Sequence, residues 1–93
     1  MHDRELTRQL AARSEITLER ARAVVQQFKA IVRQEVAAGR EVYLTGLGKF
    51  TTRRFPHRTR VSHFTGQIMD MPARRIPRFQ TSPVWRRQAV REE

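Results

Sequence analysis

Apolar residues recur with a helical period over the first part of the chain. Two leucines one helical turn apart predict a short helix over residues 3–13. A longer stripe follows, and its members are Ala21, Val24, Val25, Phe28, Ile31, Val32 and Val36. Steps of one, three and four residues place this stripe on one face of a second helix, over about residues 18–38. Thr17 suits the cap at its start, and Gly39 suits its end.

The apolar period shortens to two after Gly39, which is typical of half-buried strands. Apolar and polar residues alternate over 41–45, and the Gly-Leu-Gly sequence of residues 46–48 makes a tight connection. A second β-rich run covers residues 49–56, and a third covers residues 67–79. The pattern therefore predicts three strands after the two helices.

The segment between the second and third strands has little apolar surface on either face. It covers about residues 52–76, with a polar tip over 57–66. An isolated two-stranded ribbon is marginal in water, so we expect this segment either to be disordered or to project until it meets a ligand. A turn centred near residue 64 would place Pro56 opposite Pro72, where neither can donate a ladder hydrogen bond.

The chain closes with the signals of a short helix. Ser82 suits the N-cap and Pro83 the first helical position. The apolar residues expected to pack from this helix are Val84, Trp85, Ala89 and Val90.

The length of 93 residues fits one domain. A chain this short buries only about 60–65% of its unfolded surface. It has no cysteine, so disulfides and thiolate metal sites are excluded. One short helix cannot cover the long apolar stripe of the second, which favours a partner subunit as the source of additional core.

The charge is divided unevenly along the chain. There are 19 Lys and Arg against 9 Asp and Glu, a net charge of +10. Residues 1–39 hold 7 basic and 5 acidic residues, whereas residues 40–91 hold 12 basic and 2 acidic ones. This asymmetry indicates a polyanion partner. Of the basic residues 17 are Arg, whose guanidinium group binds phosphate bidentately and fits narrow grooves.

Other classes of function lack support in the sequence. No apolar run is long enough to span a membrane, and the N-terminus lacks the apolar stretch of a signal peptide, so a cytoplasmic protein is expected. We expect no enzyme, cofactor or small-molecule substrate, because there is no Gly-rich phosphate loop and no evident histidine–acid set beside a serine. His2, His57 and His63 lack the spacing of a metal site.

The order of these elements resembles the HU and integration host factor family of bacterial nucleoid DNA-binding proteins. The residues that carry the resemblance are Gly39, Val42, Leu44, Gly46-Leu47-Gly48, Phe50, Arg58-Thr59, Thr65-Gly66, Ile76-Pro77 and Phe79. They are spread over the whole chain. The family motif at the turn reads Gly-Phe-Gly-x-Phe, so Leu47 stands in place of a phenylalanine.

The resemblance implies an α+β fold that forms an intertwined dimer. Each chain would have two N-terminal helices, a three-stranded antiparallel sheet, a long protruding β-arm and a short C-terminal helix. The single domain, residues 1–93, would comprise a helical dimerisation part (1–39), the sheet and arm (40–81, with the arm over about 52–76), and a C-terminal helix and tail (82–93). The expected dimer core is Val25, Phe28, Val32, Val36, Leu44, Leu47, Phe50 and Phe79.

The function implied is architectural binding of double-stranded DNA in the nucleoid. Paired basic arms would enter the minor groove and bend or compact DNA with little sequence preference. The expected DNA-binding residues are Arg53, Arg54, Arg58, Arg60, His63, Phe64, Arg74, Arg75, Arg78, Lys49 and Arg86. The partners would be DNA and a second copy of the chain, or a paralogue in a heterodimer.

The arm tip departs from the family pattern. Family members carry Arg-Asn-Pro there, and the proline wedges between base pairs, whereas this chain has Val61-Ser62-His63. The adjacent Phe64 is the expected wedge, and a less sharp bend is the alternative. Two other functions remain open from the residues alone: an RNA-binding or ribosome-associated basic protein, and a structural protein that bridges DNA or forms filaments on it.

Overall fold

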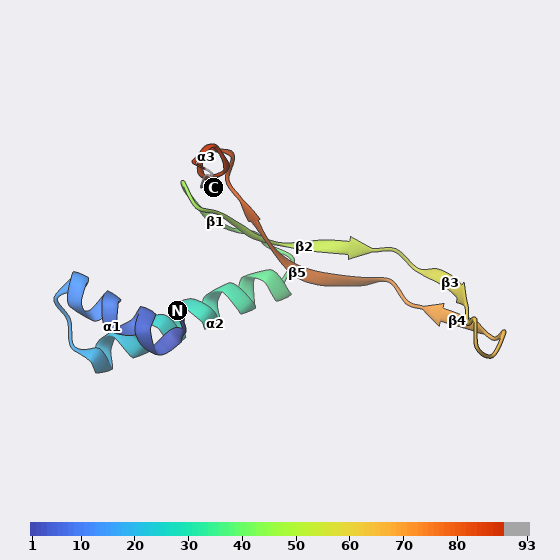
Figure 1. Ribbon diagram of the computed structural model, residues 1–93, viewed down its shortest axis with the longest axis horizontal. Coiled ribbons are helices and arrows are strands. Elements are labelled where there is room, and N and C mark those ends of the chain that lie inside the picture. The colour runs from blue at the N-terminus through green and yellow to red at the C-terminus, as the bar shows by residue number, and fades with distance from the viewer. Residues whose placement is uncertain (89–93) are drawn as a thin grey trace, which may run out of the picture. The chain divides into compact units, whose positions relative to one another are not determined.

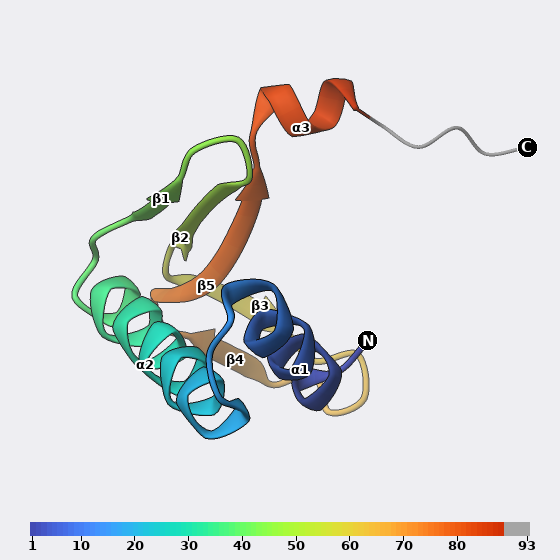
Figure 2. The same ribbon diagram turned by 90° about the vertical axis from the view of Figure 1, so that its left-hand side faces the viewer.

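The computed structural model describes residues 1–88 of the chain. The described chain divides between Glu35 and Val36 into two compact units. The first unit is helical and the second holds all the strands (Figures 1 and 2). Ala89, Val90 and the tail assigned to the C-terminal helix lie outside the described residues.

The helical unit consists of α1 (Asp3–Ser14) and nearly all of α2 (Leu18–Ala37), which confirms the two predicted helices. The Thr17 side chain accepts a hydrogen bond from the backbone N–H of Arg20 at 3.1 Å, as expected of an N-cap. The buried residues of this unit are Thr7, Ala11, Ala21 and Val25. These four side chains are the buried core of the helical unit.

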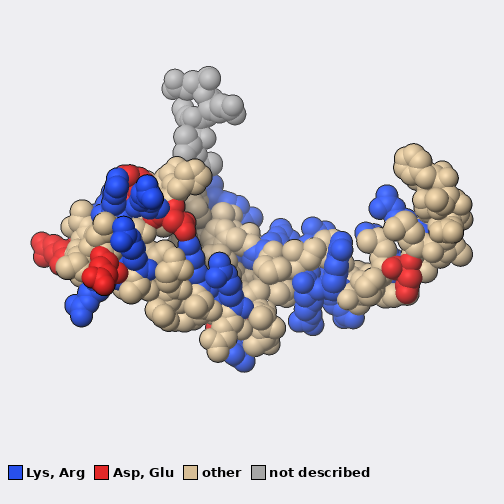
Figure 3. Space-filling model, turned by 90° about the horizontal axis from the view of Figure 1, so that it is seen from below, with Lys and Arg blue, Asp and Glu red and all other residues tan. Residues whose placement is uncertain are grey.

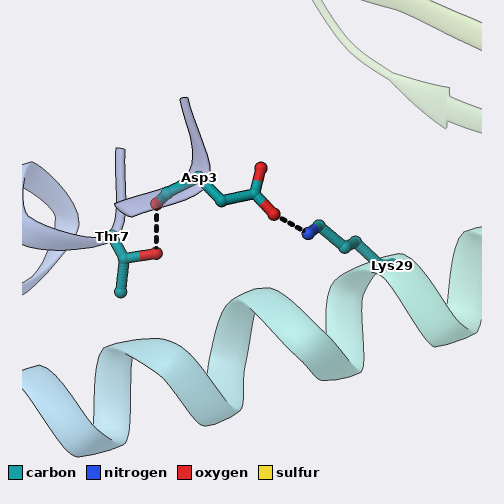
Figure 4. A network of polar contacts seen from close by, with 3 residues as sticks. All are labelled: Asp3, Thr7 and Lys29. Carbon is teal, nitrogen blue, oxygen red and sulfur yellow. Dashed lines mark hydrogen bonds and ion pairs between the residues drawn. The ribbon is translucent and has the colours of Figure 1, made fainter. Parts of the chain in front are cut away.

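A polar contact also ties α1 to α2. Lys29 donates to the carboxylate of Asp3, and the Thr7 hydroxyl donates to the backbone carbonyl of Asp3 at 2.6 Å (Figure 4). The hydrogen bond from Lys29 and its positive charge hold the pKa of Asp3 below its usual value of 3.8.

The second unit is built on a three-stranded antiparallel sheet. Its strands are β1 (Val42–Leu44), β2 (Gly48–Phe55) and β5 (Arg74–Thr81), in the order β1-β2-β5. The Phe50 ring packs on that of Phe79 with 4.9 Å between ring centroids. Trp85 meets Phe79 edge-on at 6.4 Å. These three rings form the aromatic cluster on one face of the sheet.

The short helix α3 (Pro83–Arg87) follows β5 and begins as predicted. The buried Ser82 side chain accepts a hydrogen bond from the backbone N–H of Trp85 at 3.1 Å, and Pro83 occupies the first turn. Within residues 1–88, no helix combines the length and apolar character needed to cross a membrane.

The arm is a continuation of β2 and β5 rather than one uninterrupted ribbon (Figure 1). Its distal part is a separate two-stranded sheet of β3 (Arg58–Val61) and β4 (Ile68–Met71). Pairing stops at Phe55 opposite Arg74 and resumes at Arg58 opposite Met71. The predicted third run is thus divided into β4 and β5, because Pro72 cannot extend the ladder, whereas the second run forms the single strand β2. The strand β3 lies within the predicted polar tip.

The predicted proline register is wrong by one residue. In every pair on both sides of the break, the two residue numbers add up to 129, as in Phe55 with Arg74 and Arg58 with Met71. Counting along this register places Pro56 level with residue 73 and Pro72 level with residue 57, so the prolines are staggered. The cause is the turn at the tip, which is centred half a residue later than predicted.

The residues expected in the dimer core differ in exposure within one chain. Val25 and Val36 are buried, and Val32, Leu44 and Phe50 are half-buried. Phe28, Leu47 and Phe79 are exposed by 44%, 42% and 38%. Other large apolar side chains exposed on the helical unit are Leu6, Leu10, Leu18, Val24 and Ile31. The single chain therefore leaves a long apolar stripe uncovered.

Candidate nucleic-acid interface

The strand pair β2–β5 distributes its arginines over both faces. Side chains alternate between faces along a strand, and directly paired residues share a face. Arg54 is paired with Arg75, and Phe55 with Arg74. The face of Phe55 carries Arg53, Arg74 and Arg78, and the opposite face carries Arg54 and Arg75. A ligand that surrounds the ribbon would meet guanidinium groups on either side.

Phe55 positions two of these arginines. The Arg53 Cζ atom lies 5.1 Å from the centroid of the Phe55 ring, and the Arg74 Cζ atom lies 5.4 Å from it. Both distances fit cation–π contacts. The sequence alone does not reveal the contact between Phe55 and Arg74, because Arg74 becomes its neighbour only through the strand register.

The distal sheet adds two exposed arginines. Arg58 pairs with Met71 and Arg60 with Met69, so both arginines lie on one face. Asp70 is the only acidic residue between positions 42 and 91, and its carboxylate contacts the His57 ring. Figure 3 shows basic side chains gathered along the ribbon and an uncharged tip beyond them. The arm therefore presents little negative charge to a polyanion.

The tip is an ordered turn without Lys, Arg, Asp or Glu over residues 61–69. The backbone N–H of Ser62 donates to the Gln67 carbonyl at 2.9 Å, and the N–H of Gly66 donates to the Ser62 carbonyl at 2.9 Å. The Ser62 hydroxyl accepts from the N–H of Phe64 at 3.3 Å. These bonds hold Phe64 at the apex, where it is 99% exposed.

Two further apolar side chains lie just below Phe64. Val61 and Ile68 form the last cross-strand pair of the ribbon and are 58% and 74% exposed. His63 is exposed beside Phe64. The tip therefore combines an uncharged apolar end with a constrained backbone, and Ser62 contributes in a way that the sequence alone did not indicate.

Lys49 and Arg86 lie near the sheet end of the ribbon. Lys49 pairs with Glu41 at 2.9 Å, and the Arg86 guanidinium donates to the Thr81 carbonyl at 3.1 Å. Both line one surface hollow together with Tyr43. Alternation along β2 places Lys49 on the same face as Arg53, so this face carries basic residues from the sheet into the arm.

No group of His, Asp and Glu side chains able to hold a metal ion occurs in the part of the chain that the structure describes. The structure thus brings together the predicted arginines of β2 and β5 on one ribbon, with Arg58 and Arg60 further out. It places Phe64 and His63 at the far end.

Comparisons with known proteins agree on one relationship. A family model described as "Bacterial DNA-binding protein" matches residues 1–89. "DNA-binding protein HU" of Nostoc sp. is 29% identical over 86 residues, which cover 92% of each chain. "Integration host factor subunit alpha" of Neisseria meningitidis is 32% identical over 69 residues, 74% of this chain and 69% of the relative.

Solved structures show the same likeness. The Anabaena HU–DNA cocrystal structure matches with a TM-score of 0.81 and 28% identity, over 95% of this chain and 96% of that one. A mutant of HU from Thermotoga maritima matches with a TM-score of 0.69 and 14% identity, over 95% and 97% of the two chains. The resemblance found from the sequence is confirmed.

Proposed function

The chain belongs to the family of bacterial DNA-binding proteins, and from this membership we propose that its β-arm is the part that bends or compacts double-stranded DNA. Members of this family are architectural and not enzymes, and their HU homologues are dimeric. The arm would enter the minor groove and recognise DNA mainly through its backbone, with little sequence preference. The nucleoid is the proposed location.

The observation that carries this proposal is the distribution of charge on the ribbon. Arginines occupy both faces of β2–β5, and the only acidic residue of the arm contacts His57. Such a ribbon has little core of its own, so a ligand that covers both faces would stabilise it. DNA backbones border the minor groove on two sides and supply phosphates to both faces.

We infer that Phe64 is the wedge that unstacks a base step. Its ring is almost fully exposed at the apex, and the turn bonds of Ser62 hold its backbone in place. Apolar side chains that enter between base pairs kink the duplex at the expense of stacking, which wider contact offsets. His63 would contact the groove beside it.

The exposed apolar stripe supports a homodimer as the active form. Val24 and Ile31 are more than half exposed on α2 although they belong to the predicted stripe. A second copy of the chain would cover this surface and bring a second arm to the same duplex. A paralogue of similar surface would do the same in a heterodimer.

The test uses a duplex of about 30 base pairs that carries a donor and an acceptor fluorophore. We expect affinity to fall steeply with salt, because each neutralised phosphate releases counterions. The change in energy transfer on binding reports how far the duplex bends. We expect Phe64→Ala to reduce this bending signal more than it reduces affinity, whereas Val84→Ala, a control on α3, should change neither. Unchanged bending in Phe64→Ala would exclude this residue as the wedge. Tighter binding of structured RNA than of duplex DNA would favour the RNA alternative.

A further inference from the structure

Two like charges face each other across the strand pair at the base of the arm. Arg54 on β2 is the direct register partner of Arg75 on β5. The Cβ atoms of such partners lie about 4.5–5.5 Å apart, and like charges in this position destabilise strand pairing. The pair stands one rung before the end of the three-stranded sheet, where Phe55 opposite Arg74 is the last pair.

No carboxylate within the described residues forms an ion pair with either arginine. The ion pairs in the structured part of the chain do not involve Arg54 or Arg75. The one acidic residue of the arm, Asp70, contacts His57 in the distal part. Among residues 1–88, the repulsion between the two guanidinium groups therefore has no internal counterion.

A surface hollow adjoins this pair. Arg54, Arg74 and Arg75 line one surface hollow together with Ala73. The small side chain of Ala73 leaves the space beside the arginines open. The guanidinium of Arg74 lies against Phe55 on the other face, so Arg54 and Arg75 supply the two cationic forks on this face. A single anion with several oxygen atoms would stabilise such a pair, because each fork can donate two parallel hydrogen bonds.

We propose that Arg54 and Arg75 clamp one phosphate group, and that its binding stabilises the pairing of β2 with β5 at the base of the arm. The inference rests on the DNA-binding function of the arm. The occupant is then a phosphodiester of bound DNA, and free inorganic phosphate offers the same oxygen chemistry.

The clamp predicts non-additive loss of affinity. Each of Arg54→Gln and Arg75→Gln lowers affinity for a short duplex about tenfold, and the double variant loses little more, because one phosphate uses both side chains. The salt slope of the double variant falls by about 1. A loss near the product of the single effects, with a slope change of about 2, would show two independent contacts and overturn the clamp.

Arg60→Gln is the matched control. Arg60 is exposed and faces Met69 instead of another arginine. The loss of DNA affinity in Arg60→Gln should therefore multiply with the loss in Arg54→Gln when the two are combined. This control separates the clamp from the broader proposal. If wild-type protein and Arg60→Gln bind DNA equally and without salt dependence, the arm is not the DNA site, whatever the result for the pair.

Backbone amide exchange supplies a second measurement. In DNA-free protein, Arg54→Gln should slow exchange near the Arg54–Arg75 rung because it removes the repulsion, and Arg60→Gln should not. Duplex or inorganic phosphate, each added to wild type at constant ionic strength, should slow the same amides but not those of the double variant. Slowing by duplex alone identifies a phosphodiester, and slowing by inorganic phosphate alone identifies free phosphate. Slowing by neither contradicts the clamp.

Discussion

Gly48 shows how a single residue constrains the sheet that carries the arm. A Cβ atom at this position would lie 2.3 Å from the backbone carbonyl oxygen of Gln80 on β5. The neighbour is backbone, so it cannot rotate away. Gly48→Ala should therefore destabilise the fold by about 1–3 kcal/mol or more, as overpacking does, and thermal unfolding would measure this.

Gly46→Ala is the matched control for this substitution. Gly46 also has a positive φ, 82°, but nothing lies within 4 Å of its Cβ position. Its substitution reports the conformational cost alone, about 1 kcal/mol. Equal losses for the two variants would mean that the approach of Gln80 has no energetic effect.

The contact between Asp3 and Lys29 makes a pH-dependent contribution to the stability of the fold. The pKa of Asp3 is lowered in the folded protein, first by the hydrogen bond from Lys29 and then by its charge. A lowered pKa means that the contact stabilises the fold above the unfolded-state pKa, and that this contribution is lost as pH falls through the folded-state pKa. Lys29→Gln should return the Asp3 pKa toward 3.8, as followed by NMR titration of its carboxylate. An unchanged titration would show that Lys29 does not hold this carboxylate in solution.

The arm, at the scale of elements, is expected to have two levels of stability. The sheet β1–β2–β5 has an aromatic cluster on one face, whereas β3–β4 is an isolated pair whose apolar side chains are largely exposed. Amides of β3 and β4 should therefore exchange much faster with solvent than those of β2 and β5 next to the cluster. DNA binding should reduce the difference. Equal protection in the DNA-free protein would contradict this expectation.

The sequence predicted the elements better than it predicted their pairing. Thr17 and Gly39 bracket α2 closely, since capping residues act on neighbouring backbone groups. The stagger of the prolines depends instead on the conformation of the tip turn, where a half-residue shift changes every partner. The contact of Phe55 with Arg74 and the register pairing of Arg54 with Arg75 follow from that register. Which residues are basic could be read from the sequence, but which ones face each other could not.

The proposed dimer concerns the whole molecule, and the α2 stripe is where it can be tested. Ile31 is 55% exposed in one chain. Ile31→Glu should shift sedimentation toward the monomer and lower the melting temperature, because a charge would be buried in the proposed interface. Gln27→Glu, an equal charge change at another exposed position of α2, should have little effect. A wild-type protein that sediments as a monomer would refute the dimer.

The uncharged tip has a consequence for the order of events on DNA. Residues 61–69 carry no formal charge, whereas the arginines lie nearer the sheet. Long-range attraction governs how fast two molecules meet, and short-range contacts govern how long they stay together. We therefore expect the base of the arm to capture the duplex first and Phe64 to enter afterwards. The association rate should depend on salt and on the arginines, and the residence time on the composition of the tip.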